Sequence, residues 1–401
     1  MGSKPTHNKE LFLAQLADSL RLKSIYLWCV FIYYTCSMPN QPATFFDPAK
    51  TFDDNFDNGP FLNGASEAPY KNSGEPSYSF LGRKLYAPFG IAAGSLPTSK
   101  HVQGAFERGF DVVCYKTQRS VPFKANAFPN VVYVDVEGDL TLEKAANPLV
   151  GHPTSDKPLE KLTVTNSFGN PSRGPDFWVE DMKQAVAAQD KGQLLISSVV
   201  GTIQDGFTQE DYYDDFAKTA ALAASAGVQA IEVNLSCPNV ASEGILCYNH
   251  DAVVSVCRKV KEAIGDIPLI AKVGYFSSDQ QQLLEQIVTD TTPYLAAFSA
   301  INTIPAAVVD EQGNQLLPGE GRLKSGMCGA SIKWAGLDMV ARLAALREKL
   351  GFNYEIIGVG GVMTPADFQQ YRAAGADVVQ SVTAAMWNAD LAAEIKESLV
   401  T

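Results

Sequence analysis

The chain has 401 residues, of which 46% are apolar and 19% charged, a composition that excludes collagen-like, low-complexity and wholly disordered proteins. Its 32 Lys and Arg and 44 Asp and Glu leave a net charge of −12, which argues against a general nucleic-acid binder because such binding depends on neutralising phosphates. The length fits two or three average domains, or a single α/β barrel with an extension, since such barrels often have ~250 residues or more.

The first 75 residues do not follow the pattern of the rest. Residues 25–34 are apolar and uncharged, but as a helix they span only ~15 Å, about half of a bilayer core. We expect them to pack on the body or to precede a true start at Met38, with a signal-peptide core as the alternative. Residues 38–75 are rich in Pro, Asn, Asp, Gly and Ser, which predicts irregular structure. The sequence thus predicts an N-terminal extension over residues 1–75 and a barrel over residues 76–401.

From residue 77 onward, short apolar runs alternate with helical stretches. The runs predict strands at 86–93, 111–116, 193–199, 229–235, 268–273, 295–302, 354–359 and 377–382. The stretches predict helices at 99–108, 178–189, 209–226, 251–264, 278–290, 332–350, 365–374 and 385–399. Continuous apolar strands are typical of parallel sheets buried on both faces. Eight strand–helix units favour an α/β fold of the (β/α)8 TIM barrel type, with an irregular N-terminal extension, over an open sheet.

A barrel of this kind carries its active site at the carboxyl ends of its strands, and polar residues gather at these positions. They include two lysines, five amides or hydroxyls and several glycines: Ala93, Gly94, Lys116, Thr117, Asn234, Lys272, Asn302, Thr303, Gly360, Gly361 and Thr383. Glycines after the seventh strand, with Gly329 before a predicted helix, suit a phosphate group bound by backbone N–H groups. No G-x-G-x-x-G or GxxxxGK[ST] motif occurs, so Rossmann and P-loop folds have no support.

The loop after the fourth strand reads NLSCPN and is the most specific motif of the chain. An asparagine can donate and accept hydrogen bonds at once, which suits recognition of a cyclic imide or amide. Cys237 beside a substrate could take a proton, because a thiol with a pKa of ~8.5 is a weak base near neutrality. Free cysteine is also a common buried residue, and we assign that role to Cys114, Cys257 and Cys328.

The seven cysteines and four histidines also limit the chemistry. An odd number of cysteines without CxxC spacing indicates reduced thiols in a cytoplasmic setting, and no disulfide framework or zinc knuckle. The histidines are scattered, so no metal site is expected.

Taken together, these motifs resemble class 1 dihydroorotate dehydrogenases. The resemblance rests on NLSCPN at 234–239, YKT at 115–117, NSFG at 166–169, Lys272, Asn302-Thr303 and Gly360-Gly361. It implies an FMN-binding (β/α)8 barrel that oxidises dihydroorotate to orotate in pyrimidine biosynthesis. In class 2 members, which bind quinone through an N-terminal helical domain, a serine replaces the cysteine. Cys237 therefore favours a soluble class 1 enzyme.

The resemblance also implies a role for each matching residue. Cys237 would be the base, Lys272 would lie at the flavin N1/O2 edge, and Lys116 would lie near both flavin and substrate. Substrate would be held by Asn166, Asn234, Asn239, Asn302 and Thr303, with backbone N–H groups of Phe168, Gly169 and Asn170 reaching its carboxylate. Flavin would also contact Ala93, Gly94, Thr117, Asn234 and Asn302, and its phosphate Gly329, Gly360, Gly361 and Thr383.

The chain departs from the family pattern at three places. Asn170 replaces an apolar residue, Val382 stands where a glycine is expected, and residues between Val136 and Thr163 form an insertion. The stretch VASEGILCYN after NLSCPN aligns without gaps to the fumarate-using subgroup, class 1A, so fumarate is the expected electron acceptor. A homodimer is expected. A separate electron-transfer subunit, as in NAD-using members, is left open.

Three other functions fit parts of the pattern. A dihydropyrimidine dehydrogenase-like enzyme acting on uracil or thymine would share the flavin, the cysteine and the Asn-Thr pair. A tRNA-dihydrouridine synthase is disfavoured by the acidic charge. A barrel that binds a ligand without turnover would lack bound flavin.

Overall fold

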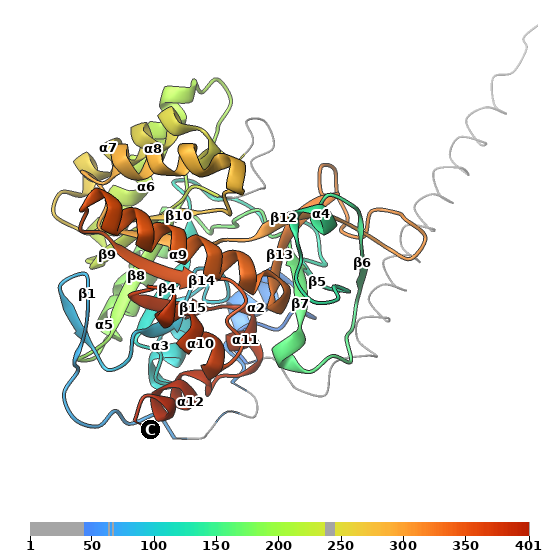
Figure 1. Cartoon of the computed structure of the whole chain (residues 1–401), viewed down its shortest axis with the longest axis horizontal. Helices are drawn as coiled ribbons and strands as arrows, with labels where there is room; N and C mark the ends of the chain where they lie inside the picture. The colour runs from blue at the N-terminus through green and yellow to red at the C-terminus, as the bar shows by residue number, and fades with distance from the viewer. Residues whose placement is uncertain (1–43, 63–64, 66–67, 237–244, 401) are drawn as a thin grey trace, which may run out of the picture.

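The computed structural model describes residues 44–62, 65, 68–236 and 245–400, and its centre is a closed barrel of eight parallel strands (Figure 1). In chain order these strands are β3 (Phe89–Ile91), β4 (Val112–Gln118), β8 (Leu194–Val199), β9 (Ala230–Asn234), β10 (Leu269–Val273), β11 (Ala297–Ala300), β14 (Glu355–Val359) and β15 (Val378–Ser381). Seven of the predicted strands contain one of them, the predicted strand at 111–116 overlaps β4, which continues to Gln118, and the predicted TIM-barrel fold is confirmed.

Helices after the strands cover the outside of the barrel. They are α3 (Ser99–Glu107), α5 (Pro175–Ala187), α6 (Gln209–Ser225), α7 (His250–Ile264), α8 (Gln281–Thr291), α9 (Lys333–Leu350), α10 (Pro365–Ala373), α11 (Thr383–Trp387) and α12 (Leu391–Ser398). The last two replace the single helix predicted at 385–399. The chain leaves the helical conformation at Asn388 (φ −116°, ψ 94°), whose side-chain oxygen accepts a bond from the Asp390 N–H.

A hairpin of β1 (Tyr78–Phe80) and β2 (Arg83–Leu85) plugs the amino-terminal end of the barrel. Phe80 and Leu85 are fully buried in one cluster with inward-facing strand residues such as Ile196 and Ile270. These apolar side chains fill the barrel interior at that end, so the polar interior residues lie nearer the carboxyl ends of the strands.

A second, smaller closed sheet stands beside the barrel and was not predicted from sequence (Figure 1). It contains β5 (Val131–Val134), β6 (Leu149–His152), β7 (Thr163–Asn166), β12 (Ile304–Val309) and β13 (Lys324–Gly329), with α4 (Leu142–Ala145) and the single turn Leu159–Lys161 between its strands. The insertion after Val136 supplies β6, and the segment between the predicted strand at 295–302 and the predicted helix at 332–350 supplies β12 and β13. The pairing of β7 with β13 joins residues that are far apart in the chain.

The described part of the N-terminal extension packs against the body. Within the region predicted as irregular, α2 (Phe52–Asn58) forms one short helix with a capping box at Thr51. Thr44 donates its hydroxyl to the carbonyl oxygens of Ala385 and Met386, and Phe45 and Phe46 are buried. Residues 25–34 lie outside the described residues. Of the described helices, none has the length and apolar character needed to cross a membrane.

Candidate active site

A pocket opens at the carboxyl ends of the barrel strands, between the barrel and the smaller sheet. It is lined by every predicted site residue in the described part of the chain, namely Ala93, Gly94, Lys116, Thr117, Asn166, Phe168, Gly169, Asn170, Asn234, Lys272, Asn302, Thr303, Gly329, Gly360, Gly361 and Thr383. The fold therefore brings together residues from all parts of the barrel. Cys237 and Asn239 lie outside the described residues.

Two lysines and two asparagines of the barrel strands and their ends line this pocket. Lys116 and Lys272 are each 5% exposed, and Lys272 is paired in register with Asn234 on the neighbouring strand. The Asn302 side-chain amide donates to the Asn234 side-chain oxygen at 3.2 Å. The pocket therefore combines buried positive charge with amide groups, an arrangement that suits an electron-accepting ring and a polar heterocycle.

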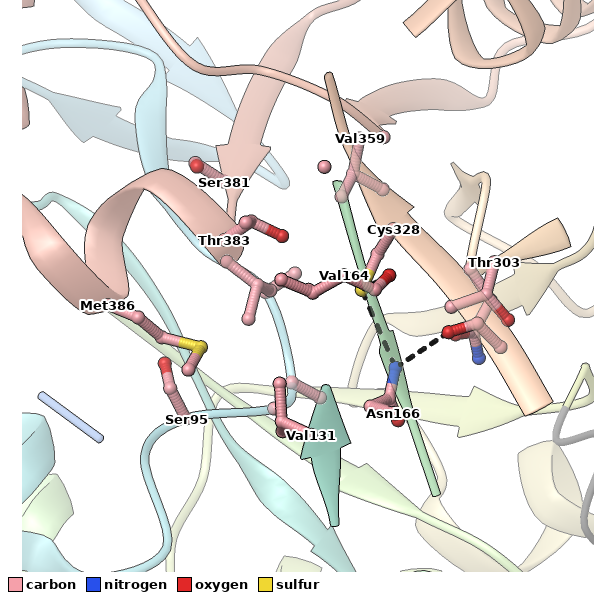
Figure 2. Close-up of a pocket in the computed structure, with 18 of the residues that line it drawn as sticks. Ser95, Val131, Val164, Asn166, Thr303, Cys328, Val359, Ser381, Thr383 and Met386 are labelled. Carbon is pink, nitrogen blue, oxygen red and sulfur yellow. Dashed lines mark hydrogen bonds between the residues drawn. The ribbon is translucent and has the colours of Figure 1, made fainter. Parts of the chain in front are cut away.

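Asn166, the last residue of β7, is a residue of the smaller sheet that lines the pocket (Figure 2). Its side-chain nitrogen lies 3.3 Å from the Gly326 carbonyl oxygen and 3.6 Å from the Cys328 sulfur. Cys328 thus lines the pocket, which corrects its assignment as a packing residue. Burial raises the pKa of its thiol, partly offset by hydrogen bonds from Asn166 and Thr383, so the thiol is neutral at pH 7.

Cys114 and Cys257 are fully buried, as predicted. Burial raises the pKa of the Cys257 thiol to about 12. Burial, and then the nearby Glu232 carboxylate, raise the pKa of Cys114 far above its usual range. Neither thiol can serve as a base near neutral pH.

Three glycines at one end of the pocket form a close backbone cradle. Gly329, Gly360 and Gly361 have φ values of +94°, +125° and +67°, which disfavour a side chain. A Cβ at Gly361 would lie 2.7 Å from the Lys333 backbone nitrogen and 2.8 Å from the Gly329 carbonyl oxygen. With the first turn of α11 beside them at Thr383, these residues fit a phosphate group held by backbone N–H groups.

The valine at position 382 is compatible with this cradle. Its φ of −126° is one that any residue can adopt, so a glycine is not required. Its side chain instead faces Gly94, where a Cβ would come within 3.0 Å of it. On the same wall, the Ser95 hydroxyl is buried and has no hydrogen-bond partner among the described residues, so it can bond a ligand.

The turn at residues 167–170 has its carbonyl groups bonded outside the pocket. Gly169 and Asn170 have φ values of +80° and +52°. A Cβ at Gly169 would meet the Asn126 side chain at 2.9 Å, and asparagine tolerates the left-handed region, which explains Asn170 in place of an apolar residue. The Phe168 carbonyl accepts the Asn126 N–H at 3.0 Å. Buried Arg119 donates to the Gly169 and Asn170 carbonyls at 3.1 and 2.8 Å.

Several lining residues were not predicted. Phe46 comes from the N-terminal extension and meets the ring of Phe168 edge-on, with centroids 5.4 Å apart. Val131 and Val164 belong to the smaller sheet, and Met386 belongs to α11 (Figure 2). No local motif marks these apolar residues, because they reach the pocket through packing between distant segments. Ser95, directly after Gly94 on the predicted rim, was the one that could have been found.

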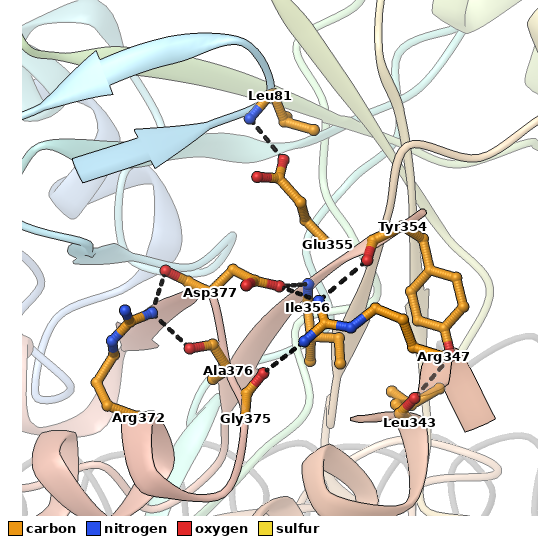
Figure 3. A network of polar contacts seen from close by, with 10 residues as sticks. All are labelled: Leu81, Leu343, Arg347, Tyr354, Glu355, Ile356, Arg372, Gly375, Ala376 and Asp377. Atoms are coloured by element: carbon orange, nitrogen blue, oxygen red, sulfur yellow. Dashed lines mark hydrogen bonds and ion pairs between the residues drawn. The ribbon is translucent and has the colours of Figure 1, made fainter. Parts of the chain in front are cut away.

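A different polar network lies at the amino-terminal ends of barrel strands β14 and β15 (Figure 3). The Asp377 carboxylate accepts bonds from the Arg347 guanidinium at 2.6 Å and from the Ile356 N–H at 2.7 Å. The Glu355 carboxylate accepts the Leu81 N–H at 2.6 Å, which ties the β1–β2 turn to β14. These carboxylates already bind protein donors at the beginning of strands, so we assign this network to stability.

Comparison with known proteins gives related sequences over most of the chain. The family model described as dihydroorotate dehydrogenase matches residues 144–401. A dihydroorotate dehydrogenase of Dictyostelium discoideum is 35% identical over 358 residues, covering 87% of this chain and 95% of that protein. The catalytic subunit of dihydroorotate dehydrogenase B (NAD(+)) of Methanocaldococcus jannaschii is 29% identical, covering 54% of this chain and 64% of that protein. Dihydroorotate dehydrogenase A (fumarate) of Lactobacillus delbrueckii subsp. bulgaricus is 28% identical, covering 62% of this chain and 76% of that protein.

Proposed function

Because the chain belongs to the dihydroorotate dehydrogenase family and so oxidises dihydroorotate in pyrimidine synthesis, we propose that it does so with bound FMN, with Cys237 as the base and fumarate as the electron acceptor. The observation that carries the proposal is the pocket at the carboxyl ends of the strands, where several groups meet. It joins a glycine cradle for a phosphate to two buried lysines and a group of asparagines.

The residues of the pocket fit FMN. Gly329, Gly360 and Gly361 would hold its phosphate, and Lys116 and Lys272 would supply positive charge near its ring system. When bound, FMN would accept the hydride that leaves C6 of dihydroorotate. The asparagines orient the pyrimidine ring, and the buried lysines offset negative charge in the pocket.

The cofactor can be tested directly. The visible spectrum of the purified protein should show a flavin, which acid should release as FMN. Anaerobic addition of dihydroorotate should bleach the flavin absorbance. FAD, or no chromophore, would refute the cofactor. Bleaching by dihydrouracil and not by dihydroorotate would favour a dihydropyrimidine dehydrogenase-like activity instead.

The base is assigned to Cys237, which lies in the sequence between β9 and α7. It would remove the proton from C5 as hydride leaves C6. Cys237→Ala should slow flavin reduction by dihydroorotate by roughly 10²–10⁴-fold, the usual contribution of a general base. Cys237→Ser should also be slow because a hydroxyl is far less acidic than a thiol. An unimpaired Cys237→Ala with a pH-independent rate would rule out this role.

Fumarate is proposed as the acceptor because the chain carries no dinucleotide motif and no cysteine spacing for an iron–sulfur centre. Both fumarate-type and NAD-type enzymes occur among its relatives, so the acceptor needs its own experiment. The protein should be reduced with dihydroorotate and offered fumarate, NAD and a quinone analogue in turn. Reoxidation by quinone alone, or by NAD only after a second protein is added, would overturn the proposal.

Two further properties follow from the proposal. We propose a cytoplasmic enzyme because the described cysteines are all free thiols, and a homodimer, which light scattering of the purified protein would test.

A further inference from the structure

Two arginines lie behind the turn at residues 167–170, on the side away from the pocket. Arg119, at the residue after β4, and Arg322, in the loop between β12 and β13, are 5% and 7% exposed. Arg322 donates to the Ser167 carbonyl at 2.9 Å, to the Ser167 hydroxyl at 3.2 Å and to the Ala127 carbonyl at 2.7 Å. It also bonds the carbonyls of Pro129 and Pro318.

Arg322 is a buried charge without a carboxylate partner. In the described part of the chain, Arg322 forms no ion pair, and each of its hydrogen bonds is to a neutral oxygen. Burial lowers the pKa of Arg322 to about 10, so the side chain still carries its charge at pH 7. A buried charge without a counter-ion is costly, which points to a use for its positive potential.

The hydrogen bonds of the turn fix the direction of its N–H groups. In a planar trans peptide, the C=O of one residue and the N–H of the next point in opposite directions. The carbonyl of Ser167 is bonded to Arg322, that of Phe168 to Asn126 and that of Gly169 to Arg119. The N–H groups of residues 168, 169 and 170 therefore point away from these partners, and all three residues line the pocket.

We propose that Arg322, together with Arg119, is a positioning residue that makes this turn selective for the substrate carboxylate. The arginines orient three peptide dipoles with their positive ends toward the pocket and place positive charge behind them. Both effects favour an anion over a neutral group of the same shape. The proposal rests on the proposed function and adds the residues that would distinguish dihydroorotate from a dihydropyrimidine without a carboxylate.

The test compares two ligands of flavin-loaded protein, orotate and its neutral amide orotamide, by calorimetry or by the change in the flavin spectrum. Arg322→Met should weaken orotate binding by about 10- to 100-fold, the range for a charge-assisted hydrogen bond, and orotamide binding much less. Arg322→Lys keeps the charge and should recover part of the preference. Arg342→Met is the matched control, because Arg342 also bonds a backbone carbonyl but is paired with Asp338, and the carbonyl it bonds belongs to Phe276 and not to the turn at residues 167–170.

A purely structural role would give a different result. If Arg322→Met weakens the binding of orotate and orotamide equally, or changes the binding of neither, the arginine does not set carboxylate selectivity and the proposal is wrong. If Arg322→Met does not fold, Arg322→Gln gives the same comparison with a polar side chain. Wild-type protein that contains no flavin, or that binds orotate and orotamide with equal affinity, would instead contradict the proposed function.

Discussion

His101 should make the stability of the protein strongly dependent on pH below 6.5. This side chain is fully buried on α3. Its Nδ1 is 2.8 Å from the Thr98 hydroxyl, while its Nε2 has no partner among the described residues and faces the Gly59 turn of the N-terminal segment. Burial, and to a lesser degree Lys100, lowers the pKa of His101 from 6.5 to about 3.

The sign and size of the effect follow from these two pKa values. Between pH 6.5 and pH 3 the unfolded chain binds a proton at His101 and the folded protein does not, so acid favours unfolding. At pH 5, 1.5 pH units below the unfolded pKa, the loss in the free energy of unfolding is about 2 kcal/mol. The same loss is expected for any folded pKa below 4, because the folded protein is then almost entirely neutral at pH 5.

The assay is urea unfolding at pH 7 and pH 5 of the wild type and of His101→Asn, with circular dichroism and tryptophan fluorescence required to coincide. The variant should be less stable at pH 7 but should lack the 2 kcal/mol loss. Asp111 acts in the opposite direction, because burial raises its pKa to about 6 and its protonation in acid favours the folded state. Both proteins keep Asp111, so its contribution cancels. An equal pH dependence in the two proteins would refute the reasoning.

Three further outcomes are expected. Gly361→Ala should lose most of its flavin, measured as the flavin-to-protein absorbance ratio, because a methyl group would meet backbone atoms at 2.7 and 2.8 Å. Gly313→Ala, also at positive φ but in open space, should retain it, and equal retention in both would contradict the cradle. Phe46→Ala should raise the KM for dihydroorotate roughly tenfold, the loss expected from one aromatic pair. Phe56 pairs with Phe177 and does not line the pocket, so Phe56→Ala should leave this KM unchanged. Deletion of residues 1–37 should leave a flavin-loaded, active enzyme, and a loss of membrane association or of quinone-dependent activity would show another role for that segment.

The sequence alone determined the barrel and much of its pocket. Parallel strands buried on both faces need continuous apolar runs, and eight of these runs alternate with helices. The predicted strands place Lys116, Asn234, Lys272 and Asn302 at or near their carboxyl ends. A closed barrel brings all of these ends to one rim, so these residues were predicted to lie in one site.

Only the tertiary structure revealed the smaller sheet and what it adds to the pocket. Its strands lie in two segments outside the alternation of strands and helices, and β7 pairs with β13 across about half of the barrel sequence. Phe46, which lines the pocket, and Arg322, which bonds the turn behind it, likewise come from segments whose local sequence carries no functional motif. Their positions depend on contacts between residues distant in the chain, and such contacts leave no mark in the spacing of neighbouring residues. The sequence pattern thus specifies the residues at the carboxyl ends of the barrel strands. Packing between distant segments decides which residues of the smaller sheet and of the N-terminal segment complete the pocket.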